Sequence, residues 1–355
     1  MALKLVIKLL KHMAYARNVN NLKSTLLIYS VTLRTLMKNI FTYLCVIFSF
    51  INLQNVSAKG APFDDKFRQL DEILPTANIY RNASGAPGHK YWQQAVNYKI
   101  KVSLDDKNQR LTGSEIITYQ NNSPDTLRYI WIQLDQNRFE QGSSYKTTST
   151  APAKEKITYK GFRKLVKMPE FEGGYQITKV TSENNPIHHV INGTMMRIDL
   201  PKPLRTGDEI DIEIDWQYQI HEQKVLGGRS GFEYFEKDDN YLYEIAQWFP
   251  RAAAYYDVYG WQNKQFLGNG EFTLEFGDYD VEITVPADHV VASTGVLNNP
   301  KKVLSKAQRQ RYSDAKTANK PVLIITPDEA LANEKSRSEE TKTWHFKAKN
   351  VRDFA

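Results

Sequence analysis

The sequence predicts an all-β fold: a large, mostly antiparallel, saddle-shaped β-sandwich that follows a cleaved leader. Three observations favour this fold class. Apolar residues alternate with polar ones over many short segments, Gly, Pro and Asn interrupt those segments, and long helical patterns are missing downstream of the leader. The regular strand–helix–strand succession typical of a parallel sheet is missing as well.

The segment from Ile210 to Ile220 is the clearest strand. Its apolar side chains occupy every second position, which puts them on one face of a strand, whereas a helix would spread them around its circumference. The same alternation runs from Val96 to Leu104, and turn-forming residues lead from there into further strands. The other predicted strands are 115–120, 127–134, 176–181, 194–200, 241–246, 271–276, 279–285, 289–294, 322–326 and 343–348. Residues 141–170 read as a surface insertion, and 328–341 as a loop with a short helical turn.

The positive charge of the chain is concentrated at its beginning. Residues 1–63 contain eight Lys and Arg and no Asp or Glu. The rest of the chain, from Asp64 onward, therefore contains 39 of the 47 basic residues and all 40 acidic ones. The formal net charge of +7 therefore belongs to the leader. A nearly neutral body argues against nucleic acid as a partner.

The leader has the organisation of a secretory signal. Lys38 precedes the uncharged apolar run from Ile40 to Ile51, and Val56-Ser57-Ala58 offers a small-residue cleavage site. A helix of that length reaches roughly 18 Å, which is short of the roughly 30 Å hydrocarbon core of a bilayer. We therefore expect a signal peptide over 37–58, an exported periplasmic or secreted product, and no stable membrane span after cleavage.

The remaining boundaries follow from the signal peptide. Residues 1–36 are then an upstream extension from a mis-assigned start, although their basic, apolar opening also fits a longer signal n-region or a surface helix. Residues 59–90 form an entry segment, and 91–355 the β domain. Cys45, the one cysteine, lies in the apolar run, so the processed protein would have neither a disulfide nor a cysteine nucleophile.

Two histidine-containing segments resemble metal sites without completing one. His221-Glu222 lacks the second histidine that a zinc-binding helix needs, since Val225 stands in its place, and the segment is expected to be the polar end of a strand. His188 and His189 are adjacent, and adjacent side chains of an extended chain point to opposite faces. We expect no catalytic residue, no metal ligand and no cofactor in this chain.

The densest aromatic region spans Tyr241 to Trp261 and carries few cations, which favours packing of a sheet over base stacking for most of its rings. Gln247 and Arg251 flank its Trp-Phe-Pro core. We expect these two polar residues at a rim or cleft, where they are candidates for substrate binding.

A family resemblance emerges from the motifs that follow one another in this region. They are Ile245-Ala246-Gln247-Trp248-Phe249-Pro250-Arg251, Tyr259-Gly260-Trp261-Gln262, Gly270-Glu271-Phe272, the run from Gly277 to Ala287, and Ala292-Ser293-Thr294-Gly295. Together with the closing segment from Trp344 to Ala355, they resemble the amino-terminal domain of aminopeptidase N-like zinc metallopeptidases. The resemblance covers roughly residues 90–355.

The resemblance implies a saddle-shaped β domain that packs on a zinc-dependent catalytic domain and lends residues to the pocket for the first residue of a peptide substrate. The family's zinc ligands and catalytic residues belong to the next domain, so none is carried over. Gln247 is similar to the family's glutamine at that pocket, in an altered context. We expect a chain truncated before its catalytic domain, with zinc and peptide as cofactor and partner of the full-length protein. The alternative is a stand-alone exported β-sandwich that binds a peptide, a glycan or a partner protein.

Overall fold

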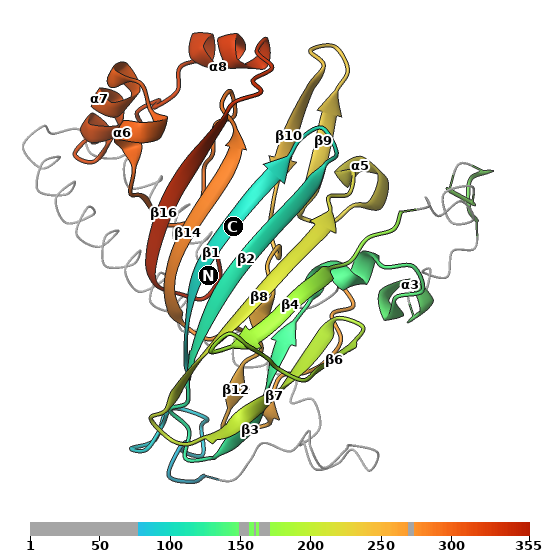
Figure 1. Cartoon of the computed structure of the whole chain (residues 1–355), viewed down its shortest axis with the longest axis vertical. Helices are drawn as coiled ribbons and strands as arrows, with labels where there is room; N and C mark the ends of the chain where they lie inside the picture. Colours follow the sequence, from blue (N-terminus) through green and yellow to red (C-terminus); the bar gives the residue numbers. More distant parts are fainter. Residues whose placement is uncertain (1–76, 149–155, 160, 163–170, 269–272) are drawn as a thin grey trace, which may run out of the picture. The chain divides into compact units, whose positions relative to one another are not determined.

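The computed structural model describes residues 77–148, 156–159, 161–162, 171–268 and 273–355 (Figure 1). The predicted signal peptide and upstream extension lie outside these ranges, as does part of the 141–170 insertion. The described residues belong to one compact unit, Pro75–Ala355. None of the helices within the described ranges combines the length and apolar character needed to span a bilayer.

An eight-stranded sheet dominates the structure (Figure 1). Its neighbouring strands pair antiparallel, except that β1 and β14 run parallel. In spatial order the strands are β15 (Val296–Leu297), β16 (Thr341–Val351), β14 (Gly277–Pro286), β1 (Ala95–Asp105), β2 (Arg110–Gln120), β8 (Glu209–Gln219), β4 (Gln176–Ser182) and β5 (Asn185–Pro186).

A four-stranded sheet packs against one face of the larger one. It consists of β11 (Arg251–Ala252), β3 (Leu127–Gln133), β7 (Met195–Leu204) and β6 (His189–Asn192). Ile130 and Ile198 from this sheet share a single buried cluster with Ile117 and Ile212 from the larger sheet. This shared core is what the alternation of apolar residues predicts, and the prediction of a mostly antiparallel all-β fold is confirmed.

Two hairpins and several short helices complete the described part. The hairpins are β9 (Gly231–Phe235) with β10 (Asn240–Glu244), and β12 (Tyr255–Tyr256) with β13 (Gly260–Trp261). The helices are η2 (Asp135–Phe139), α3 (Ser144–Thr148), α5 (Gln223–Leu226), α6 (Pro300–Val303), α7 (Lys306–Ala315) and α8 (Pro327–Glu334).

Three of the predicted strands do not form in the part of the chain that the structure describes. Described residues 273–276 make only an isolated bridge, at Phe276, and residues 289–294 form a loop. Residues 322–326 lead into α8, whose first turn is capped by Thr326. The apolar residues of these segments pack in the core or line a cavity, but their backbone does not form a ladder with a neighbouring strand. Alternation of apolar and polar residues therefore predicted strands wrongly here.

Candidate functional site

An apolar cavity of about 1000 Å³ lies beside the resemblance motif from Ile245 to Arg251. Its floor is the inner face of the eight-stranded sheet, where β1, β2 and β14 present alternate apolar side chains. Its walls come from the β9–β10 hairpin, the 288–293 loop and the end of α8. Residues central to the lining are Val102, Leu104, Leu111, Tyr241, Leu242, Tyr243, Trp248, Ile283, Val285, Val291 and Phe354.

Aromatic contacts hold the hairpin wall in shape. The ring of Tyr241 lies 5.7 Å from that of Phe232 and 4.9 Å from that of Tyr234. Tyr243 donates its hydroxyl to Oε1 of Gln109 at 2.5 Å, and burial raises the pKa of Tyr243 above its ordinary value. The wall therefore presents tyrosine rings, which offer apolar area with few rotatable bonds.

The cavity lining also includes charged residues, six Asp and Glu and three Lys and Arg. Two of the carboxylates have partners: Asp239 lies 3.7 Å from Arg337, and Asp288 accepts from the Ser338 amide at 2.7 Å. Burial opposes ionisation of Asp288, but the hydrogen bonds from His289 and Ser338 outweigh it and lower its pKa. The excess of negative charge favours a ligand with a cationic group.

Gln247 lies beside this cavity, at the bend between its lining residues Ala246 and Trp248. Its backbone has a φ of 53°, a left-handed conformation that is uncommon for a residue other than glycine. The Gln247 carbonyl accepts from Nε2 of Gln136 at 2.9 Å, which fixes the bend. No hydrogen bond of the Gln247 side chain occurs within the described ranges, and that side chain is half-buried.

Arg251 does not lie at a rim, contrary to the expectation from sequence. The residue is 5 % exposed and forms ion pairs with Asp135 and with Asp353, the latter at 2.5 Å. Burial opposes the charge, yet the two carboxylates raise the pKa of Arg251 above its ordinary value. The sequence could not reveal this, because Asp135 and Asp353 are both more than a hundred residues away along the chain.

The cavity also includes residues that the sequence did not indicate as binding candidates, above all Phe354 and the 288–293 loop. The dense aromatic cluster was a usable signal for Tyr241, Tyr243 and Trp248. No local pattern distinguishes Phe354 or Val291 from ordinary core residues, because their places in the wall depend on contacts between distant segments.

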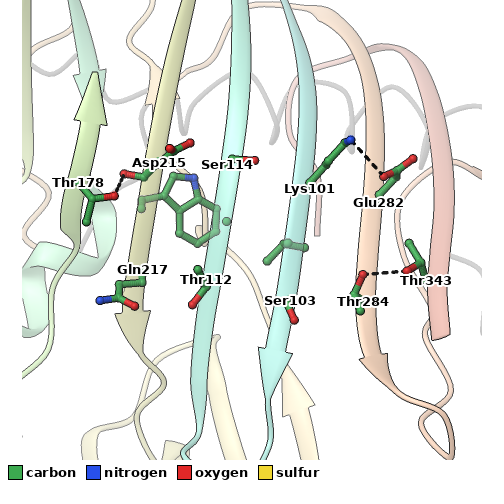
Figure 2. A pocket seen from close by; sticks show the side chains of 13 residues that line it. Lys101, Ser103, Thr112, Ser114, Thr178, Asp215, Gln217, Glu282, Thr284 and Thr343 are labelled. Atoms are coloured by element: carbon green, nitrogen blue, oxygen red, sulfur yellow. Dashed lines mark hydrogen bonds and ion pairs between the residues drawn. The ribbon is translucent and has the colours of Figure 1, made fainter. Parts of the chain in front are cut away.

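A second hollow, of about 610 Å³, lies on the opposite face of the same sheet (Figure 2). Short hydroxyl side chains form a row across neighbouring strands there. In the strand register, Thr112 lies opposite Ser103, Ser103 opposite Thr284, and Thr284 opposite Thr343. Lys101 lies 3.9 Å from Glu282 beside this row. Hydroxyls and paired charges of this kind are typical of a solvated sheet face.

The two histidine segments do not fit a zinc ion. His221 is buried against the Phe139 ring at 4.1 Å, its Nε2 lies 3.1 Å from the Gly227 carbonyl, and burial lowers its pKa. His188 pairs with Asp199 through Nδ1 at 2.9 Å. No group of three or more His, Cys, Asp and Glu arranged for a metal occurs among the described residues.

No model of a known protein family matches the chain, and no curated protein matches it. Among solved structures, it is similar to an M1 zinc metallopeptidase from Deinococcus radiodurans, with 13 % identity and a TM-score of 0.36 over 75 % of this chain and 42 % of that one. A mutant of that enzyme bound to a Tyr-Ser-Ala substrate gives 13 % and 0.35 over 72 % and 39 %. The chain thus spans about two fifths of the length of these structures. At this identity and superposition, the similarity establishes neither family nor activity.

Proposed function

We propose that this chain is the amino-terminal β domain of an exported zinc-dependent aminopeptidase, and that it supplies part of the binding site for a peptide substrate. One observation carries the proposal. The motif from Ile245 to Arg251, on which the family resemblance depends, also provides Ile245, Ala246 and Trp248 to the wall of the apolar cavity.

The cavity suits the amino-terminal end of a peptide. Its apolar floor would accept a hydrophobic first side chain, and the excess of carboxylates around it would favour the α-ammonium group. In this proposal Gln247, at the bend, contacts the peptide with its side-chain amide. The hydrolytic chemistry, with its zinc ion, belongs to a separate catalytic domain, and no step of it is assigned to residues of this chain.

The binding role can be tested with a tripeptide, Leu-Ala-Ala, that carries fluorescein at its carboxyl end and a free α-amine. We expect saturable binding to the full chain by fluorescence anisotropy, and weaker binding of the amino-terminally acetylated peptide. Gln247→Ala should weaken binding about fivefold, because it removes one polar contact. The control is Gln176→Ala, which removes an exposed glutamine bonded to Gln217 on the other side of the sheet.

Equal affinity for the free and acetylated peptides would contradict recognition of the amino terminus. The aminopeptidase assignment has its own test, which is the reading frame downstream of codon 355. We expect it to encode G-x-M-E-N and then H-E-x-x-H within roughly a hundred codons. A stop codon directly after Ala355 in the native transcript would favour the independent exported binding module.

A further inference from the structure

The residues that follow β16 are held by two separate segments of the chain, one that contains Trp248 and Arg251 and one that contains Thr294. Asp353 pairs with Arg251 of β11, and the Phe354 carbonyl accepts from Nε1 of Trp248 at 2.9 Å. The Ala355 carbonyl accepts from the Thr294 amide at 2.8 Å, and the Ala355 amide donates to Oγ1 of Thr294 at 3.1 Å. We refer to Arg352–Ala355 as the anchored segment.

The anchored segment forms part of the cavity wall. Phe354 is 1 % exposed, and its ring lies 5.8 Å from that of Tyr279 and 6.4 Å from that of Trp248. Phe354 and Ala355 both line the apolar cavity. The position of this short segment therefore shapes part of the cavity wall.

Arg251 connects this wall to the core. The Asp135 side chain is 2 % exposed and holds one end of the guanidinium in the interior. The Asp353 side chain is 42 % exposed, so the other end of the guanidinium reaches out to the anchored segment. A planar guanidinium can pair with two carboxylates at once, whereas a lysine ammonium could not hold both in this geometry.

We propose that Arg251 is a positioning residue: by holding Asp353, it places Phe354 in the wall of the cavity and so limits the apolar group that the cavity admits. The proposal rests on the peptide-binding function above. Arg251 touches no ligand in it and acts only through the anchored segment.

The test uses Asp353→Ala in the full chain, because changing Arg251 would leave Asp135 buried without its partner and could prevent folding. We expect amide hydrogen exchange at Thr294 and Ala355 to become about tenfold faster, as the anchor loosens locally. Affinity for the labelled Leu-Ala-Ala peptide should fall about fivefold, and the unfolding midpoint should change by less than about 2 °C, because Asp353 is half-exposed.

Two variants serve as controls. Asp353→Asn keeps an oxygen acceptor for Arg251 and should recover part of both the slow exchange and the affinity. Asp199→Ala removes an exposed carboxylate paired with Arg197 at 2.8 Å and should change neither. Unchanged exchange at Thr294 and Ala355 in Asp353→Ala would overturn the anchoring. Faster exchange with unchanged affinity would overturn the positioning role, and a wild-type chain that binds no peptide would overturn the proposed function itself.

Discussion

Glu115 is a carboxyl group inside the core of the larger sheet. It is 2 % exposed, its neighbours across the strands are Ile100 and Ile214, and neither of its oxygens has a hydrogen-bond partner in the described part of the chain. Burial raises its pKa well above 4.5. The folded chain therefore holds Glu115 as a neutral acid at pH values where an exposed glutamate is ionised.

This placement makes the free energy of unfolding depend on pH. Between pH 4.5 and the raised pKa, the folded chain keeps the proton that the unfolded chain loses, so stability falls as pH rises through that window. We expect Glu115→Gln to remove this fall and to be more stable than wild type by about 1–3 kcal/mol at pH 8, with no comparable gain at pH 4. Urea unfolding at pH 4, 6 and 8 measures the effect.

Glu213→Gln on the adjacent strand is the matched control. Glu213 pairs with Lys179 at 2.6 Å, and the hydrogen bond from Lys179 lowers its pKa. Its contribution is present above the ordinary glutamate pKa and is lost as pH falls, so Glu213→Gln should bring no gain at pH 8. Parallel pH profiles for wild type and Glu115→Gln would contradict a neutral, buried Glu115.

At the scale of a residue, the two binding candidates predicted from sequence, Gln247 and Arg251, differ in how far their neighbours along the chain determine their positions. Gln247 lies beside a cavity, at the bend between two of its lining residues. Arg251, four residues further along, is buried because its partners Asp135 and Asp353 come from distant segments. The residues next to a polar side chain in the sequence do not show whether a distant segment provides a buried partner for it.

At the scale of elements, β2 and β8 depend on one close approach. Gly113 lies opposite Trp216, and a Cβ at Gly113 would come within 2.4 Å of the Trp216 ring. The indole covers the inner side of β2 at this point and contacts Tyr175 and Trp248 in the core. The missing side chain of Gly113 thus makes room for the large Trp216 side chain, which is 1 % exposed.

We expect Gly113→Ala to destabilise the chain by about 1–3 kcal/mol, because the added methyl group forces Trp216 out of its packed position. A shift of tryptophan emission together with a lowered midpoint of urea unfolding would show this. Ser114→Ala, one residue further on the exposed face, should leave both unchanged. A Gly113→Ala chain with wild-type stability would mean that Trp216 can move at no cost.

The helix α7 was missed by the sequence analysis although a signal for it exists. Ser305 caps the first turn through the Gln308 amide, and the Gln308 side chain returns a bond to Ser305. This S-x-x-Q spacing is a recognisable start of a helix. The polar helix that follows has no buried residue and hence no apolar stripe, so periodicity could not find it.

At the scale of the whole molecule, export remains a prediction that the described residues do not address. We expect the exported protein to begin at or near Lys59, because small residues at Val56-Ser57-Ala58 end the apolar run. Amino-terminal sequencing of the exported form measures this. Ala58→Arg should block cleavage and retain the leader, and a processed start upstream of Met37 would contradict the signal peptide.

The sequence by itself determined the all-β class, most of the long strands and which of their faces is buried. These follow from alternation within single segments, which is a local property. The tertiary structure alone decided the parallel pairing of β1 with β14, the burial of Arg251 and the place of Phe354 in the cavity wall. Each of these depends on contacts between segments far apart in the chain. The energies of such contacts cannot be inferred from the pattern of residues within one segment.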